Sequence, residues 1–166
     1  MRKISIEDVD VEVNPQATHS VRRPLSEALG TDHFAMNYFE LEPGETFSGG
    51  LHAHHDQEEV FYVQSGVATF EVADEPDSGA AESVTVEAGE LIRFSPGEFQ
   101  TGYNESDTDE RVVGLAFGAP TPRHDWSEIE AAIPCRECDD ETGHEMAPVD
   151  GGFEFTCMEC GNRFST

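Results

Sequence analysis

The chain has 166 residues, of which 35 are acidic and 9 basic, so its net charge is −26. A surface this acidic disfavours nonspecific binding to the phosphate backbone of nucleic acids. The longest apolar runs are far shorter than the roughly 20 residues that a membrane-spanning helix needs. The basic start, residues 1–3, is followed by charged residues and lacks the apolar centre of a secretory signal. We therefore expect a cytoplasmic protein that has no membrane segment and does not bind nucleic acid.

Residues 1–30 combine two local patterns. Apolar residues recur at every second position, which predicts one or two short strands, at Ile4, Ile6, Val9, Val11 and Val13. Residues 24–30, which end in Gly30, predict a short helical turn closed by glycine. We expect both features to pack on the domain that follows.

Residues 31–118 contain short β-forming runs separated by turn residues every 8–12 positions. The predicted strands are 33–41, 60–63, 67–72, 84–86, 91–94, 99–103 and 111–117. The acidic, small and Pro/Gly-containing stretch 73–83 predicts a surface hairpin loop. Repeated short strands of this kind are typical of an all-β sandwich or barrel.

Residues 119–134 interrupt the strand pattern and predict a linker. Asp125 and Glu128 have the spacing of a capping box, which favours a short helix over Trp126–Ile133. Pro134 then ends the helix, because the residue before a proline disfavours helical geometry.

A histidine-rich stretch, residues 50–66, carries the strongest chemical signal in the barrel segment. His52 and His54 are two positions apart, so on an extended strand their side chains point the same way. Glu59 follows shortly after. Imidazole nitrogens and a carboxylate are a usual ligand set for a divalent transition metal, so we predict that these three residues bind one.

This stretch resembles the first motif of the cupin superfamily. That motif is a glycine-rich approach, His-x-His, three or four residues, Glu, six residues and Gly. The chain matches it in full with His52, His54, Glu59 and Gly66.

Residues 89–104 resemble the second cupin motif, which is Gly, five residues, Pro-x-Gly, two residues, His, three residues and Asn. Gly89, Gly97 and Asn104 keep the spacing, but Ser95 replaces the proline and Gln100 replaces the histidine.

The resemblance implies a jelly-roll barrel, or double-stranded β-helix, with Fe(II), Mn(II), Ni(II) or Zn(II) near its centre. Gln100 stands at the fourth ligand position, where a neutral amide oxygen is a weaker ligand than imidazole. His55 is an alternative ligand if the strand register shifts by one. Further pocket contacts are expected from Tyr38, Arg93 and Tyr103, although Arg93 equally suits a surface position.

Residues 135–166 contain two Cys-x-x-Cys pairs with eighteen residues between them, formed by Cys135, Cys138, Cys157 and Cys160. In a cytoplasmic protein this spacing indicates a structural zinc site rather than disulfides. The segment resembles a small zinc ribbon. Its acidic composition favours a structural, dimerising or partner-docking role over contact with nucleic acid.

These features leave three functions open. The first is a metal-dependent cupin enzyme, such as a dioxygenase or isomerase, that acts on a small molecule. The second is a non-catalytic barrel that senses or binds a small ligand and signals through the zinc ribbon. The third is a dimerisation barrel whose zinc ribbon docks a protein partner. We expect a homodimer, and the fold alone does not choose among the three functions.

The distribution of charge predicts a dependence on salt. Acidic residues are spread along the whole chain and interleaved with aromatic residues, unlike a disordered acidic tail. Their mutual repulsion is screened at about 1 M salt, where the Debye length is roughly 3 Å. We interpret this composition as that of a halophilic protein, and expect it to lose structure on dialysis into low salt. A melting temperature that is independent of salt from millimolar to molar concentration would contradict this interpretation.

Overall fold

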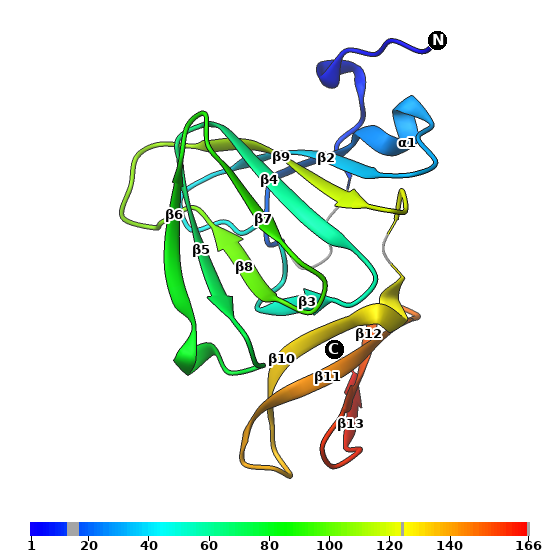
Figure 1. The fold of residues 1–166 in the computed structure, drawn as a ribbon, viewed down its shortest axis with the longest axis vertical. Helices are drawn as coiled ribbons and strands as arrows, with labels where there is room; N and C mark the ends of the chain where they lie inside the picture. Colours follow the sequence, from blue (N-terminus) through cyan, green and yellow to red (C-terminus); the bar gives the residue numbers. More distant parts are fainter. Residues whose placement is uncertain (13–16, 124, 166) are drawn as a thin grey trace.

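A computed structural model describes residues 1–12, 17–123 and 125–165 of the chain (Figure 1). Two antiparallel sheets account for its strands. The five-stranded sheet has the order β1 (Val21–Pro24), β2 (Ala35–Leu41), β9 (Val112–Ala119), β4 (Glu58–Ser65) and β7 (Leu91–Phe94). The eight-stranded sheet has the order β13 (Arg163–Ser165), β12 (Gly152–Cys157), β11 (Asp140–Val149), β10 (Ile129–Cys135), β3 (His52–His54), β8 (Phe99–Tyr103), β5 (Val67–Ala73) and β6 (Glu82–Glu87).

Helical structure in the described residues is short. One α-helix, α1, spans Leu25–Leu29 and ends at Gly30, whose φ of 69° lies in the left-handed region as expected for a closing glycine. The 3₁₀ turns are η1 (Ile6–Asp8), η2 (Ser78–Ala80) and η3 (Trp126–Glu128). No helix in these parts of the chain is long and apolar enough to cross a membrane.

The core between the two sheets is built from phenylalanines. Phe39 and Phe61 come from the five-stranded sheet, Phe70 comes from the eight-stranded sheet, and Phe47 lies between them. The ring of Phe47 has its centroid 5.2 Å from those of Phe39 and Phe61 and 5.7 Å from that of Phe70. Alternate residues of each strand therefore fill the barrel with aromatic contacts. The predicted all-β barrel is confirmed.

The predicted N-terminal strands are wrong for the residues that the structure describes. Residues 4–12 contain the 3₁₀ turn η1 and no strand, while Val13 lies outside the described residues. Ile4 and Ile6 instead line a shallow pocket with Leu25 and Leu29 of α1. Two of the alternating apolar side chains thus lie partly buried against a helix. The two-residue alternation identified side chains that contact the rest of the fold, but it carried no information on whether a partner strand was available.

The predicted helix over Trp126–Ile133 is also wrong. The chain makes only the 3₁₀ turn η3, with Asp125 accepting a hydrogen bond from the backbone of Ser127, and then enters strand β10. Ile129 and Ala131 alternate with less buried residues, and β10 pairs with β3 on one side and β11 on the other. Backbone pairing with the barrel therefore outweighs the local helix signal. Residues 129–135 extend the barrel sheet instead of linking two units (Figure 1).

Gly66 predicts a stability difference between two glycine variants. Gly66 has a φ of 78°, and a Cβ there would lie 2.5 Å from the carbonyl oxygen of Arg111, whereas Gly89 has a φ of 92° and nothing within 4 Å. Both Gly→Ala changes carry the left-handed backbone cost, but only Gly66→Ala adds a steric clash. We expect Gly66→Ala to lower the free energy of unfolding by about 1–3 kcal/mol more than Gly89→Ala, measured by denaturant unfolding in high salt. Equal losses would contradict the clash.

Candidate metal centres

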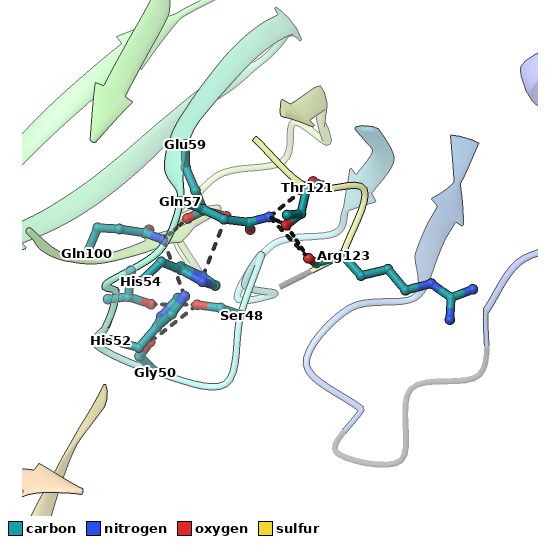
Figure 2. Close-up of polar contacts among 10 residues, drawn as sticks. Ser48, Gly50, His52, His54, Gln57, Glu59, Gln100, Thr121 and Arg123 are labelled. Carbon is teal, nitrogen blue, oxygen red and sulfur yellow. Dashed lines mark hydrogen bonds and ion pairs between the residues drawn. The ribbon is translucent and has the colours of Figure 1, made fainter. Parts of the chain in front are cut away.

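Three strands bring the first group of candidate ligands together inside the barrel (Figure 2). His52 and His54 lie on β3, with ring centroids 5.0 Å apart, and Gln100 lies on β8 directly opposite His52. Glu59 lies on β4 in the other sheet, so its carboxylate reaches the site from the opposite wall. One ligand atom from each of His52, His54 and Glu59 lies within 4.8 Å of the others. The expected convergence of these three residues is confirmed.

Hydrogen bonds orient the ligand atoms of this cluster. The Nδ1 of His52 lies 2.8 Å from the carbonyl oxygen of Gly50, so Nδ1 carries the proton and the Nε2 lone pair is left for the cluster. The Nε2 of His54 lies 3.6 Å from Oε1 of Glu59. A neutral imidazole fixed in this tautomer and a facing carboxylate fit the needs of a divalent transition metal.

Gln100 occupies the fourth position through its amide nitrogen. Its Nε2 donates to Oε2 of Glu59 at 2.8 Å and lies 3.4 Å from Nε2 of His52. A half turn of the amide would present Oε1 to the cluster in its place. Gln100 is 3% exposed, so whichever atom it presents is confined to this site.

Burial shifts the ionisation of the cluster towards its neutral forms. Desolvation raises the pKa of Glu59 to about 7, although the hydrogen bond from Gln100 lowers it in part. Desolvation also lowers the pKa of His52, against the raising effect of its hydrogen bond to Gly50. The charged forms of Glu59 and His52 are therefore disfavoured in this cluster. A cation placed among these atoms would stabilise the ionised carboxylate.

Gln57 is a site residue that the sequence did not reveal. Its side chain is 2% exposed, and its Nε2 donates to the carbonyl oxygens of Thr121 and Arg123 at 3.1 and 3.2 Å (Figure 2). A Cβ on Gly118 would lie 3.1 Å from its Oε1. Gln57 thus holds segment 119–123 beside the cluster. Its place within the histidine-rich stretch was the only signal, because its partners lie more than sixty residues away.

Four expected pocket residues lie outside the cluster. The Nε2 of His55 pairs with Oε2 of Glu130 at 2.9 Å, so no register shift brings it to the ligand position. The others pair with acidic side chains: Tyr38 with Glu40 at 3.1 Å, Arg93 with Glu58 at 2.7 Å, and Tyr103 with Glu71 at 3.5 Å. Arg93 is 56% exposed, in agreement with the surface alternative.

The four cysteines form the second candidate centre. Cys135 ends β10 and Cys157 ends β12, and one sulfur from each of the four lies within 4.8 Å of the others. The sulfur atoms of Cys135 and Cys160 are 3.6 Å apart, and those of Cys138 and Cys157 are 3.9 Å apart. Tetrahedral zinc with bonds of about 2.3 Å requires sulfur atoms roughly 3.8 Å apart, whereas a disulfide requires about 2.05 Å. These separations fit four zinc ligands.

Polar groups around Cys157 favour its thiolate. Desolvation raises the pKa of this thiol, but the hydroxyl of Thr142 at 3.2 Å and the backbone N–H groups of Cys160 and Glu159 lower it, to a net value of about 6. The backbone N–H of Gly161 also donates to the carbonyl of Cys157 at 2.9 Å, and Gly161 has a φ of 73°. This is the tight turn expected of a metal-binding cysteine pair.

Comparison with known proteins finds a sequence similarity within the barrel. Residues 37–116 match the family described as a cupin domain. Over these residues the barrel is similar to a cupin domain. A comparison with curated proteins finds no similar sequence.

Solved cupin-type structures share this fold. A sugar phosphate isomerase from a cupin superfamily of Silicibacter pomeroyi is 20% identical, with a TM-score of 0.66, and the match covers 96% of this chain and 95% of that one. A cupin protein from Bacteroides fragilis is 17% identical, with a TM-score of 0.51 and coverage of 71% and 89%. An oxalate decarboxylase from Lactobacillus farciminis, in a formate complex, is 19% identical, with a TM-score of 0.56 and coverage of 72% and 33%. At these identities the likeness shows the fold alone.

The raised pKa of Glu59 predicts that the stability of the metal-free protein depends on pH. The folded protein keeps this carboxyl protonated up to about pH 7, whereas the unfolded chain releases the proton near pH 4.5, so this group lowers the free energy of unfolding as pH rises between the two values. Glu59→Gln removes this loss. We expect the stability of the variant relative to the unmodified protein to grow by up to about 3 kcal/mol from pH 4.5 to pH 8.

This comparison uses denaturant unfolding in high salt with the same chelator for both proteins. Glu58→Gln is the matched control, because Glu58 is the neighbouring residue and its side chain is 46% exposed. A stability difference for Glu59→Gln that stays constant across this pH range would show that the carboxyl titrates normally.

Proposed function

We propose that this protein is a metal-dependent cupin in which His52, His54 and Glu59 hold a divalent transition metal and a small molecule is acted on or sensed at that metal. The observation that carries the proposal is the convergence of two imidazoles and a carboxylate within 4.8 Å, from both walls of the barrel. Two histidines and one carboxylate on one side of a metal leave other coordination positions open. The proposed metals are Fe(II), Mn(II), Ni(II) and Zn(II), and the proposed reaction classes are dioxygenase and isomerase.

The residues of the chain would prepare this site in defined ways. A bound metal would supply a Lewis acid that polarises an oxygen of the small molecule. The hydrogen bond from Nδ1 of His52 to Gly50 keeps Nε2 directed at the metal position. Glu59 offsets the charge of the metal, and Gln100 holds one oxygen of that carboxylate in place. Gln57 ties segment 119–123 to the histidine-rich stretch through two backbone carbonyls.

The charges near the site favour one class of small molecule. The backbone carbonyl of Arg123 lies beside the cluster, but its guanidinium points away, is 79% exposed and pairs with Glu27 at 3.5 Å (Figure 2). This arrangement favours a molecule bound through its own oxygen atoms on the metal over one bound through a phosphate on an arginine. A sugar phosphate, which the name of the Silicibacter relative suggests, is therefore less well supported than an oxygen-rich molecule without phosphate.

The four cysteines complete the proposal with a structural zinc. Their sulfur separations, and the lowered pKa of Cys157, support a closed tetrahedral site with no position open for substrate. The halophilic character, the cytoplasmic location and the homodimer remain predictions of the sequence.

A second function is favoured by one observation, the hydrogen bond at 2.8 Å between Gln100 and Glu59. This bond gives the buried carboxyl of Glu59 a hydrogen-bond partner without a metal. In this alternative the barrel binds a small ligand non-catalytically, through the same polar residues.

Metal content separates the two functions. In protein reconstituted in high salt with the four candidate metals, we expect about two metals per chain in the unmodified protein and about one in a His52→Ala/His54→Ala variant, measured by elemental analysis. His33→Ala is the matched control, because His33 is exposed and lies outside the cluster. If the unmodified protein and the double variant both hold a single zinc, the barrel has no metal and the second function stands.

Gln100→His tests the fourth position. An imidazole there would restore the ligand that the cupin pattern carries and would remove the amide that bonds to Glu59. We expect the dissociation constant of the barrel metal to fall by about tenfold or more, measured by isothermal titration calorimetry. A weaker or unchanged affinity would show that Gln100 is already a well-placed ligand or partner.

A further inference from the structure

The strand that carries both histidines, β3, is short and is held in place by its neighbouring strands. β3 contains three residues and pairs with β8 at one position, His52 with Gln100. With β10 it pairs at three successive positions, His52 with Ala131, Ala53 with Glu130 and His54 with Ile129. Most of the strand pairing that places the two imidazoles therefore comes from the C-terminal part of the chain.

Backbone hydrogen bonds at both ends of β3 extend this pairing. The N–H of Ala132 donates to the carbonyl of Leu51 at 2.9 Å, and the N–H of His55 donates to the carbonyl of Glu128 at 2.8 Å. Segment 128–132 thus follows β3 beyond its three residues. A movement of this segment would move both imidazoles together.

The other end of β10 enters the cysteine cluster. β10 ends at Cys135, and its pairing with β11 runs over six positions, from Glu130 with Glu145 to Cys135 with Asp140. β11 in turn pairs with β12, which ends at Cys157. A zinc on the four sulfurs would therefore join the ends of two strands within the same sheet that carries the histidines.

A continuous row of side chains connects the two centres. His52, Ala131, His144 and Cys157 are successive register partners across β3, β10, β11 and β12, so their side chains share one face of the sheet. Ala131, His144 and Cys157 are 9%, 0% and 1% exposed. The Nδ1 of His144 lies 2.9 Å from the carbonyl of Thr142, whose hydroxyl lies 3.2 Å from the sulfur of Cys157. Close packing of this kind transmits a displacement instead of absorbing it.

We propose that the tetracysteine cluster is a positioning element for the barrel metal site: zinc on the four cysteines fixes β10, and β10 fixes the strand that carries His52 and His54. This inference rests on the proposed function, because it requires a metal in the barrel. It assigns the C-terminal segment a role in the barrel site itself, beyond holding its own fold together.

The test measures binding at the barrel when the zinc site is broken. Cys138→Ser/Cys160→Ser removes two thiolates and leaves the buried Cys135 and Cys157 in place. The probe is Mn(II), which binds nitrogen and oxygen ligands and has little affinity for thiolates, or whichever of the four candidate metals fills the barrel of the unmodified protein. We expect its dissociation constant to rise at least tenfold in the double variant. Met158→Ser, an exposed change in the same turn, should leave it unchanged.

Hydrogen exchange on the unmodified chain provides a readout that needs no variant and no barrel metal. Removing zinc with a chelator should speed exchange of the Ala132 and His55 amides, which bond across β3, while the amides between β5 and β6 stay protected.

The outcomes separate the two claims. If no candidate metal fills the barrel of the unmodified protein, the proposed function fails, and the positioning role fails with it. If the metal binds the zinc-free double variant with unchanged affinity, only the positioning role is overturned. Exchange that is unchanged at Ala132 and His55 would also overturn the positioning role, because zinc would then have no effect on β3. Exchange that rises equally in β5 and β6 would overturn it as well, because zinc would then stabilise the whole fold alike.

Discussion

The candidate metal site depends on the backbone hydrogen bonds that hold a three-residue strand in place. β3 is too short to define its own position, so the two imidazoles lie where β8 and β10 put them. The third ligand comes from the opposite sheet, and its distance from β3 is set by the phenylalanine core between the sheets. A small displacement of β3, or a small change in the distance between the sheets, would disrupt the site, because metal–ligand distances tolerate deviations of only a few tenths of an ångström.

The electrostatics of the site are consistent with this dependence. A carboxylate that is desolvated inside a barrel is stabilised either by taking up a proton or by pairing with a cation. Gln100 donates only one neutral hydrogen bond to the carboxylate of Glu59. His52, which desolvation keeps neutral, cannot provide the positive charge. A divalent metal would satisfy all three groups at once. The same burial makes the ionised carboxylate costly in the metal-free state.

Much of the barrel could be predicted from the sequence because its signals are local. Apolar alternation and turn residues identified the strands between residues 33 and 117 except β3. The two-residue spacing of His52 and His54 identified the shared direction of their side chains. The spacing of the cysteine pairs likewise predicted their convergence.

The sequence did not show which strands pair with each other in the sheets. The capping pattern at Asp125 and Glu128 suggested a helix, but pairing with β3 and β11 drew the following residues into a strand. The partners of Gln57, His55 and Tyr103 likewise lie far away in the sequence.

The most direct measurement is anomalous X-ray diffraction from crystals grown in high salt with the reconstituted protein. We expect two peaks. One lies about 2.3 Å from each of the four cysteine sulfurs, and the other lies about 2.0–2.2 Å from a nitrogen of His52, a nitrogen of His54 and an oxygen of Glu59. A single peak at the cysteines, with the amide of Gln100 still bonded to Glu59 in crystals supplied with each candidate metal, would contradict it.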